Sequence, residues 1–171
     1  MRLFSRLVLV LALALPGVLS AAPAAAAPLA SFSGTCHSNV RVFLTNMGND
    51  TVVGPITIAR DVGVAGVATL TLPDGTELTG PVSGRQKVVA NAMTQTAEVI
   101  GRVSGSAAGG NLTMGYTAHL DLSTGKFTGE MHVLESSGAL AGFFFNGRAE
   151  GHLVGPLGAE GSSSGPCHLG I

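Results

Sequence analysis

Short stretches of alternating apolar and polar residues, separated by turn residues, make up most of the chain after its N-terminal segment. This period of two is typical of β-strands with one buried face, and there is little helical signal. The chain has 25 glycines, and those inside the apolar stretches suit a sheet that curls. The pattern predicts an all-β domain with strands over 40–45, 52–59, 67–72, 76–79, 86–90, 97–104, 112–122, 127–134, 139–146 and 152–154. The Gly/Ser-rich tail over 158–165 reads as a loop or a weak last strand.

The first of three candidate hairpins surrounds Pro73-Asp74-Gly75. Proline suits the second position of a type I turn, and glycine can adopt the positive φ that a short hairpin loop requires. A three-residue loop sets Leu70 opposite Leu78, so that apolar residues meet across the two strands.

Two further hairpins predict a three-stranded meander from Leu112 to Asn146. A turn around Thr124-Gly125 sets Leu122 opposite Phe127, and a turn at Ser136-Ser137 begins the third strand. A one-residue slip would mix the two faces of this sheet. The sequence leaves open which face lines the interior. The apolar face consists of Leu112, Met114, Tyr116, Ala118, Leu120, Leu122, Phe127, Met131, Val133, Leu140, Gly142 and Phe144.

The first 26 residues have the order of a secretory signal peptide. Arg2 and Arg6 precede an unbroken apolar run over 7–15, and mostly small residues follow over 20–27. The apolar run is too short to span a bilayer, which takes about 20 residues. We expect cleavage after Ala26, which leaves a secreted or periplasmic domain over 27–171 without an integral membrane segment.

Two cysteines, Cys36 and Cys167, lie near the two ends of this domain. A disulfide is their default state in an exported protein, and it would hold their Cα atoms about 5–6 Å apart. The first and last strands must then be neighbours, as they are in a sheet that closes on itself. The sequence therefore predicts a single antiparallel β-barrel of about eight strands, closed by a terminal disulfide.

The charge of the domain argues against several classes of partner. Without the two arginines of the signal peptide, seven Lys and Arg residues oppose ten Asp and Glu residues, a net charge of −3. Such a surface does not favour nucleic acid or anionic membranes. The chain also has no phosphate-binding glycine loop, no Cys-x-x-Cys and no His-Glu-x-x-His motif. We therefore expect a protein that is not an enzyme.

The polar face of the meander carries charged candidates for a binding site. In the predicted register His119 lies opposite Glu130, with His132 diagonal to His119 and Asp121 two residues further along. Such neighbours lie about 5–8 Å apart. Two imidazoles and two carboxylates at this spacing could hold a zinc ion. A solvated polar face with a His–Glu pair is the simpler interpretation.

Aromatic residues join the same face in the predicted third strand. That strand adds Phe143 and Phe145, with Ala141 opposite His132. An apolar patch on an otherwise polar face often marks a contact site, unless a loop or a chain end covers it. The predicted ligand-binding site consists of His119, Glu130, His132, Phe143 and Phe145.

Two smaller features have simpler explanations than chemistry. His37 and His168 each follow a cysteine, so a disulfide would hold them near each other, but two exposed histidines near the chain ends fit as well. The stretch 161–165 matches Gly-x-Ser-x-Gly, yet the catalytic motif needs a strand-to-helix turn and this stretch lies in a low-complexity tail.

Gly151, Gly155, Pro156 and Glu160 have the spacing of a strand-loop motif near the end of the chain. With this motif, the segment from Gly115 to Gly161 resembles the β-barrels of transferrin-binding-protein-B-like proteins. In that family a glycine and an aromatic pair lead into Gly-Pro, and a glutamate follows four residues after the proline. The stretches 116–122 and 125–129 are also similar to the family's penultimate hairpin. Leu153-Val154 replaces the aromatic pair, and the lipidation cysteine of many members is missing. The resemblance implies an eight-stranded barrel that binds a host iron protein or haem. The residues that match the strand-loop motif are Gly151, Gly155, Pro156 and Glu160.

These observations favour a non-enzymatic binding barrel whose ligand is a small apolar molecule, haem or a partner protein. A second hypothesis is an extracellular protein-interaction module, such as an adhesin or an enzyme inhibitor, whose interior is filled by its own side chains. A third is a pocket-type isomerase or cyclase, for which Glu98 and Arg102 on one strand face could supply acid–base groups. The sequence identifies neither the ligand nor a cofactor.

Overall fold

A computed structural model describes residues 29–170, and all regular structure within them is β. The predicted signal peptide and its cleavage position lie outside the described residues. None of the described residues belongs to a helix long and apolar enough to cross a membrane. The nine strands are β1 Phe32–Asn46, β2 Asn49–Val53, β3 Ile56–Thr71, β4 Glu77–Asn91, β5 Thr96–Ala107, β6 Gly110–Asp121, β7 Lys126–Gly138, β8 Phe144–Val154 and β9 Gly158–Leu169.

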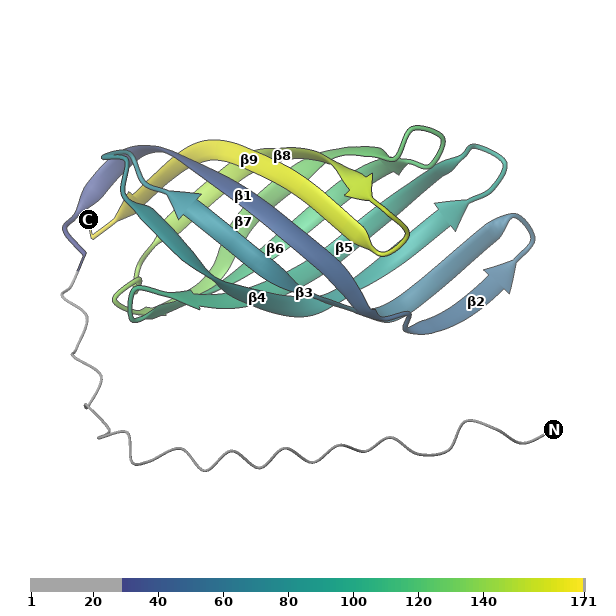
Figure 1. Ribbon diagram of the computed structural model, residues 1–171, viewed down its shortest axis with the longest axis horizontal. Coiled ribbons are helices and arrows are strands. Elements are labelled where there is room, and N and C mark those ends of the chain that lie inside the picture. Colours follow the sequence, from purple (N-terminus) through teal and green to yellow (C-terminus); the bar gives the residue numbers. More distant parts are fainter. Residues whose placement is uncertain (1–28, 171) are drawn as a thin grey trace, which may run out of the picture.

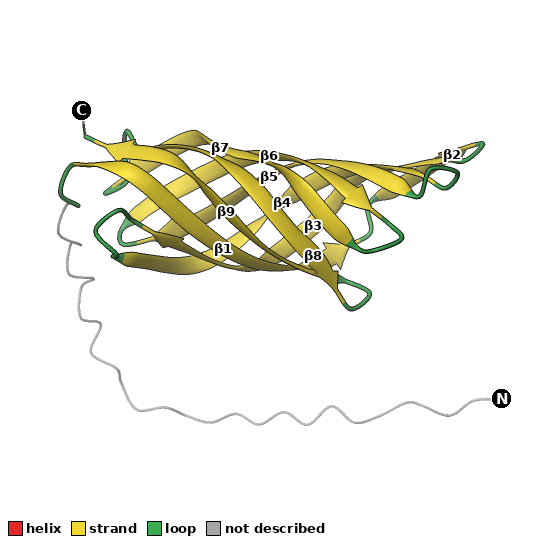
Figure 2. Ribbon diagram, turned by 90° about the horizontal axis from the view of Figure 1, so that it is seen from above, coloured by secondary structure: helices red, strands yellow, loops and turns green. Residues whose placement is uncertain are grey.

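Eight of these strands close into an antiparallel barrel. The sheet runs in the order β1-β9-β8-β7-β6-β5-β4-β3-β2, and a further pairing of β1 with β3 joins its ends (Figure 1). Strand β2 pairs with β3 alone and projects beyond the barrel at the end opposite the start of β1 and the end of β9 (Figure 2). The predicted all-β fold, a closed barrel of eight strands, is confirmed.

The first and last strands of the barrel are neighbours, as the cysteines predict. Strand β1 pairs with β9 from Phe32, opposite Leu169, to Phe43, opposite Gly158. The Cys36–Cys167 disulfide joins the two strands with a Cα–Cα distance of 5.7 Å. The Gly/Ser-rich tail is therefore a full strand and not a loop. Its weak intrinsic propensity is overridden because β1 and β8 offer hydrogen-bond partners on both sides.

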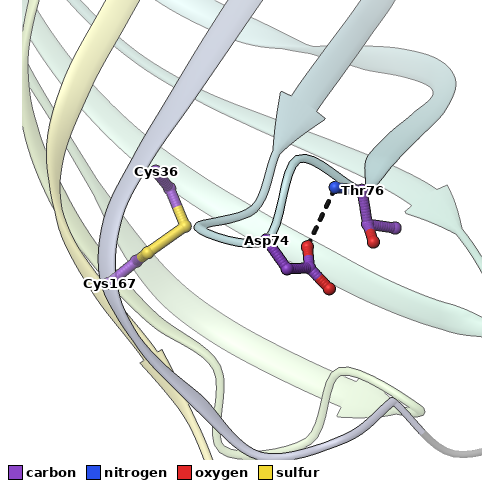
Figure 3. The surroundings of a disulfide bond; sticks show 4 residues. All are labelled: Cys36, Asp74, Thr76 and Cys167. Carbon is purple, nitrogen blue, oxygen red and sulfur yellow. Dashed lines mark hydrogen bonds between the residues drawn. A yellow bond between two sulfur atoms is a disulfide. The ribbon is translucent and has the colours of Figure 1, made fainter.

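The hairpin between β3 and β4 has the predicted register. Leu70 lies opposite Leu78, and Gly75 has a φ of 86°. The Asp74 carboxylate accepts a hydrogen bond from the amide of Thr76 at 2.9 Å (Figure 3). Hydrogen bonds from Thr76 keep the pKa of Asp74 below its ordinary value. This turn is specified by the chemistry of adjacent residues, which is why the sequence predicts it.

The hairpin between β6 and β7 differs from the predicted register by two residues. Leu120, and not Leu122, lies opposite Phe127. The reason is Asp121, whose side chain accepts hydrogen bonds from the amides of Ser123 at 2.8 Å and Thr124 at 3.3 Å. These bonds form an Asx turn that ends β6 at Asp121. A slip of two residues keeps the side chains within β6 and β7 on their predicted faces, and the apolar face lines the barrel interior. Leu122, predicted on that face, lies beyond the end of β6 and is 40% exposed.

The hairpin between β7 and β8 differs by five residues, an odd number. His132 lies opposite Asn146 and not opposite Ala141. Strand β7 continues through the predicted turn to Gly138, and a loop follows in which Gly142 has a φ of 78°. An odd slip exchanges the two faces of a strand.

The odd slip reverses which side chains of the run Phe143-Phe144-Phe145 face the barrel interior. The predicted placement of Phe143 and Phe145 on the polar face with His119 and His132 is wrong, because both phenylalanines lie inside the barrel and are buried. Phe144, which was predicted to face the apolar side, lies outside and is 42% exposed.

The predicted strand over 52–59 contains a turn. It is divided between β2 and β3, which pair with each other from Val53, opposite Ile56, to Asn49, opposite Arg60. Gly54 has a φ of 58°, and proline follows it, so the two residues between the strands have the composition of a tight turn.

Candidate functional site

The barrel interior is filled at the end where β1 begins and β9 ends. Leu140 and Phe145 there are 1% and 0% exposed, and the turn between β3 and β4 lies beside the disulfide (Figure 3). These side chains close one end of the barrel and form a floor for the space beyond them. This floor cluster consists of Cys36, Leu72, Leu78, Leu140, Phe143, Phe145, Cys167 and Leu169.

Beyond the floor cluster the lumen contains a cavity of about 300 Å³. Its inward-facing lining is mostly apolar, and all of the apolar side chains named here except Val64 are only partly buried. An apolar side chain that faces inward and yet keeps accessible surface borders an empty space, because a packed core would cover it. The apolar lining includes Val40, Val42, Leu44, Val64, Val88, Val99, Val103, Ala118, Leu120, Phe127, Met131 and Ala149.

Glycines at inward positions explain why the lumen is hollow. The interior of an eight-stranded barrel is just wide enough for its own side chains, so positions without a side chain leave room. Gly101 has a second role, since the ring of Tyr116 lies over it and a Cβ atom at this position would overlap that ring. Inward glycines on the barrel strands include Gly84, Gly101, Gly129, Gly151 and Gly161.

Tyr116 and Gln86 form a polar pair in the wall of the lumen. Both lie level with Gly101, one on each neighbouring strand. The Tyr116 hydroxyl donates a hydrogen bond to Oε1 of Gln86 at 2.6 Å. Burial raises the pKa of Tyr116 to about 12. The hydroxyl is therefore protonated at neutral pH and acts as a hydrogen-bond donor.

The elevated pKa of Tyr116 can be tested directly, because the chain has one tyrosine and no tryptophan. Tyrosinate absorbance should titrate with a midpoint near pH 12 in the folded protein and about pH 10 in the denatured protein. Since the unfolded state loses this proton first, stability should be unaffected below about pH 10 and should fall by about 3 kcal/mol as the pH approaches 12. A folded-state midpoint near that of the denatured protein would show that Tyr116 is solvated.

A second polar pair lies on the opposite wall. Ser38 of β1 lies opposite Ser163 of β9, and their hydroxyl oxygens are 2.8 Å apart. Both residues are buried and border the same cavity. Ser163 is the central serine of the Gly-x-Ser-x-Gly stretch. It lies within a strand and is hydrogen-bonded to another serine, so it lacks the strand-to-helix turn of a catalytic nucleophile.

Among residues 29–170, Glu130 is the one charged residue that borders the cavity, and it is exposed at an outward position of β7. Every Asp, Glu, Lys and Arg in this range is exposed except Glu160, which is partly buried. Glu160 forms an ion pair with Arg41 on the outer surface, with 2.9 Å between Nε and Oε1. The interior is thus apolar, with two neutral hydrogen-bonded pairs.

The structure does not bring the five predicted site residues together. His119, Glu130 and His132 are exposed on the outer surface, whereas Phe143 and Phe145 belong to the floor cluster inside. The predicted arrangement, with all five on one face, is wrong because of the odd slip between β7 and β8.

The partners of His119 also differ from the prediction. Thr128, and not Glu130, lies opposite His119 on β7. On its other side His119 lies opposite Glu98 of β5, with 3.9 Å between Nδ1 and Oε1. Both side chains are highly exposed, and an exposed pair of this kind contributes little to stability.

His37 and His168 are not neighbours either. His37 lies opposite Ser164, whereas His168 lies opposite Ser33. Four positions along β1 correspond to about 13 Å. His168 instead stacks on the ring of Phe144, with 4.8 Å between ring centroids and 13° between planes.

Gln86 and the role of Tyr116 were not predicted from the sequence. A signal for Gln86 is present, because the inward positions of β4 alternate as Val82, Gly84, Gln86 and Val88. Alternate residues of a strand share one face, so the valines and the glycine indicate that Gln86 is a polar residue on the interior face. The predicted strand over 86–90 begins at Gln86 and does not include Val82 and Gly84. It therefore does not show that Gln86 alternates in step with these inward residues.

No protein-family model matches the chain, and no curated protein matches its sequence. The resemblance to transferrin-binding-protein-B-like proteins therefore stays a prediction.

Within the part of the chain that the structure describes, no three His, Cys, Asp or Glu side chains are grouped so that they could hold a metal ion. The disulfide fits a protein that works outside the cytoplasm.

Proposed function

We propose that this protein is a secreted or periplasmic binding barrel that holds a small apolar ligand in its lumen. The observation that carries the proposal is the cavity of about 300 Å³, which is lined by partly accessible valine, leucine, alanine, methionine and phenylalanine side chains. A ligand that covers these side chains gains about 25 cal/mol for each Å² of apolar surface removed from water. Ligand pockets of proteins have this character, with few polar groups in a mostly apolar wall.

Binding suits this lumen better than catalysis. The inward-facing described residues of the lumen include no Asp, Glu, Lys or His that could act as a general acid or base near neutral pH, and Glu130, which borders the cavity, is exposed on the outer side of β7. Tyr116 is the titratable side chain that borders the cavity on the inside, and its raised pKa makes it a hydrogen-bond donor and not a base. An isomerase or cyclase would have to work through shape and this one hydroxyl.

Among the ligands that the sequence leaves open, haem fits this lumen less well than a smaller molecule. The five histidines lie on the outer surface or, in the case of His168, against Phe144, and do not line the cavity. The cavity is also at the small end of the range of ligand pockets, about 300–1,000 Å³. We therefore propose a small apolar molecule.

Filling the cavity tests this proposal. The substitution Ala118→Phe places a ring in the lumen, and we expect it to weaken binding of the neutral apolar dye N-phenylnaphthylamine at least about tenfold, because the dye and the ring compete for one space. The matched control is His119→Phe, the next residue, which is 79% exposed on the outer surface. Dye fluorescence measures the affinity, and thermal unfolding checks that both variants are folded.

Equal dye affinities in the wild type and the Ala118→Phe variant, with both folded, would show that the lumen is not the binding site. A ligand that copurifies with the protein from its native host, detected by native mass spectrometry as mass lost on denaturation, would identify the natural occupant.

A protein-interaction role is the second candidate, and the rim of the barrel favours it. Met47, Val52, Val53 and Met93 lie at the end opposite the floor cluster and are 62–81% exposed. Strand β2 also has one edge without a partner among the described residues, and such edges can pair with another chain. A partner bound to this rim would tolerate Ala118→Phe, so the same variant separates the two candidates.

A further inference from the structure

The two polar pairs of the lumen restrict the chemistry of its ligand. Tyr116 donates its hydroxyl hydrogen to Oε1 of Gln86. This bond orients the Gln86 amide and leaves both hydrogens of its Nε2 without a partner within residues 29–170. Between Ser38 and Ser163 one hydroxyl donates to the other, so one hydroxyl hydrogen is not used in the pair. The lumen therefore offers hydrogen-bond donors to whatever occupies it.

In the lumen, a donor hydrogen without an acceptor costs more free energy than an acceptor lone pair without a donor. A buried donor without an acceptor costs about 1–3 kcal/mol, while an oxygen that already accepts one hydrogen bond tolerates an empty lone pair more readily. In the empty barrel, water can satisfy the Gln86 amide. A ligand that displaces this water without supplying an acceptor loses part of what it gains by apolar burial.

The charge of the lining sets a second restriction. Among the described residues that line the cavity there is no Lys, Arg or His, and the one charged residue is the exposed Glu130. A carboxylate that enters this space leaves water and meets no positive charge, and burying an unpaired charge is costly.

The strand order places the two polar pairs on opposite walls. Ser38 and Ser163 lie on the adjacent strands β1 and β9, whereas Gln86 and Tyr116 lie on β4 and β6. Around the closed sheet, three strand steps separate β9 from β6, and two separate β1 from β4. The pairs thus face each other across the cavity that both of them border.

We infer that the ligand is an uncharged, largely apolar molecule with a hydrogen-bond acceptor such as a carbonyl oxygen, which accepts from the Gln86 amide. This inference rests on the proposed function and adds the ligand class to it. Gln86 is the donor, and Tyr116 is the positioning residue that orients its amide.

Three probes of the same size test the inference on the wild-type protein. Methyl octyl ketone, nonanoate and undecane have the same number of non-hydrogen atoms, and at about pH 7 they are respectively a neutral acceptor, an anion and an alkane. We expect the ketone to bind at least about tenfold more tightly than nonanoate, and undecane reports the apolar contribution alone. Headspace partition measures the two volatile probes, and equilibrium dialysis measures nonanoate.

A double variant then assigns the hydrogen bond. The substitutions Gln86→Met and Tyr116→Phe together remove both members of the pair, so neither is left unsatisfied. We expect the double variant to weaken ketone binding about five- to tenfold, the equivalent of one hydrogen bond, with undecane unchanged or slightly tighter. Lys87→Met, at the next residue on the exposed side of β4, is the control and should change neither.

The outcomes separate this inference from the proposed function. If none of the three probes binds the wild type, both are overturned. If nonanoate binds as tightly as the ketone, the lumen is a binding site without the proposed preference, and the inference alone fails. Ketone binding that the double variant leaves unchanged would also overturn it.

Discussion

Removal of the Cys36–Cys167 disulfide is expected to lower the free energy of unfolding by about 5 kcal/mol. The two cysteines are 131 residues apart in the chain, and the entropy lost by the unfolded chain on closing a loop of that length corresponds to about this value. Small and medium-sized domains have a total stability of about 5–15 kcal/mol. The variant Cys36→Ala/Cys167→Ala should therefore be marginally folded or unfolded.

Urea unfolding of the wild type, the reduced wild type and the double alanine variant measures this effect. The reduced wild type keeps its sulfur atoms in the floor cluster, so it isolates the effect of the cross-link. The alanine variant adds the loss of two side chains that are 0% and 2% exposed. A loss below about 1 kcal/mol on reduction would mean that the barrel closure between β1 and β9 does not depend on the cross-link.

Truncation of Phe145 is expected to be the most damaging single change in the floor cluster. Phe145 is 0% exposed and packs among the disulfide and the leucines at the closed end of the barrel. Phe145→Ala should destabilise the protein by about 3–5 kcal/mol, because it removes a buried ring and leaves a cavity. Urea unfolding compared with the wild type measures this loss.

The adjacent residue is the matched control for this prediction. Phe144 is 42% exposed and stacks on His168 on the outside of the barrel. We expect Phe144→Ala to cost less than about 1 kcal/mol, because the ring buries less surface. Similar losses for the two variants would contradict the inward position of Phe145.

If Phe143 and Phe145 formed the predicted contact site on the surface, substituting both by serine would weaken binding and leave the fold intact. Because both lie in the floor cluster, we expect this double substitution to disrupt the fold instead.

The filled end of the barrel stabilises the fold, and the hollow half provides the cavity. The floor cluster and the disulfide hold the closed end together, while inward glycines leave the other half open. A closed sheet keeps its backbone hydrogen bonds without a fully packed interior, which allows part of the lumen to stay empty. The stability of the barrel and the capacity of its cavity therefore depend on different residues, and the variants above change one at a time.

Features that neighbouring residues encode were predictable from the sequence. Alternation separated the apolar face of β6 and β7 from the polar face, since a slip of two residues does not exchange faces, but it did not show which face lines the interior. The Pro73-Asp74-Gly75 turn fixed the pairing of β3 with β4 through local dihedral preferences. The two cysteines also determined that the chain ends meet, because a disulfide constrains two Cα atoms wherever they lie in the sequence.

Features that depend on partners far along the chain appear only in the folded protein. Strand β9 forms from a Gly/Ser-rich segment because β1 and β8 lie on either side of it. The odd slip between β7 and β8 reversed the phenylalanine run, since the loop length there is set by contacts of Leu140 and Phe143 with the floor cluster and not by a local turn signal. The cavity exists because inward positions of eight strands meet around it, and no single strand shows whether the side chains opposite it fill that space.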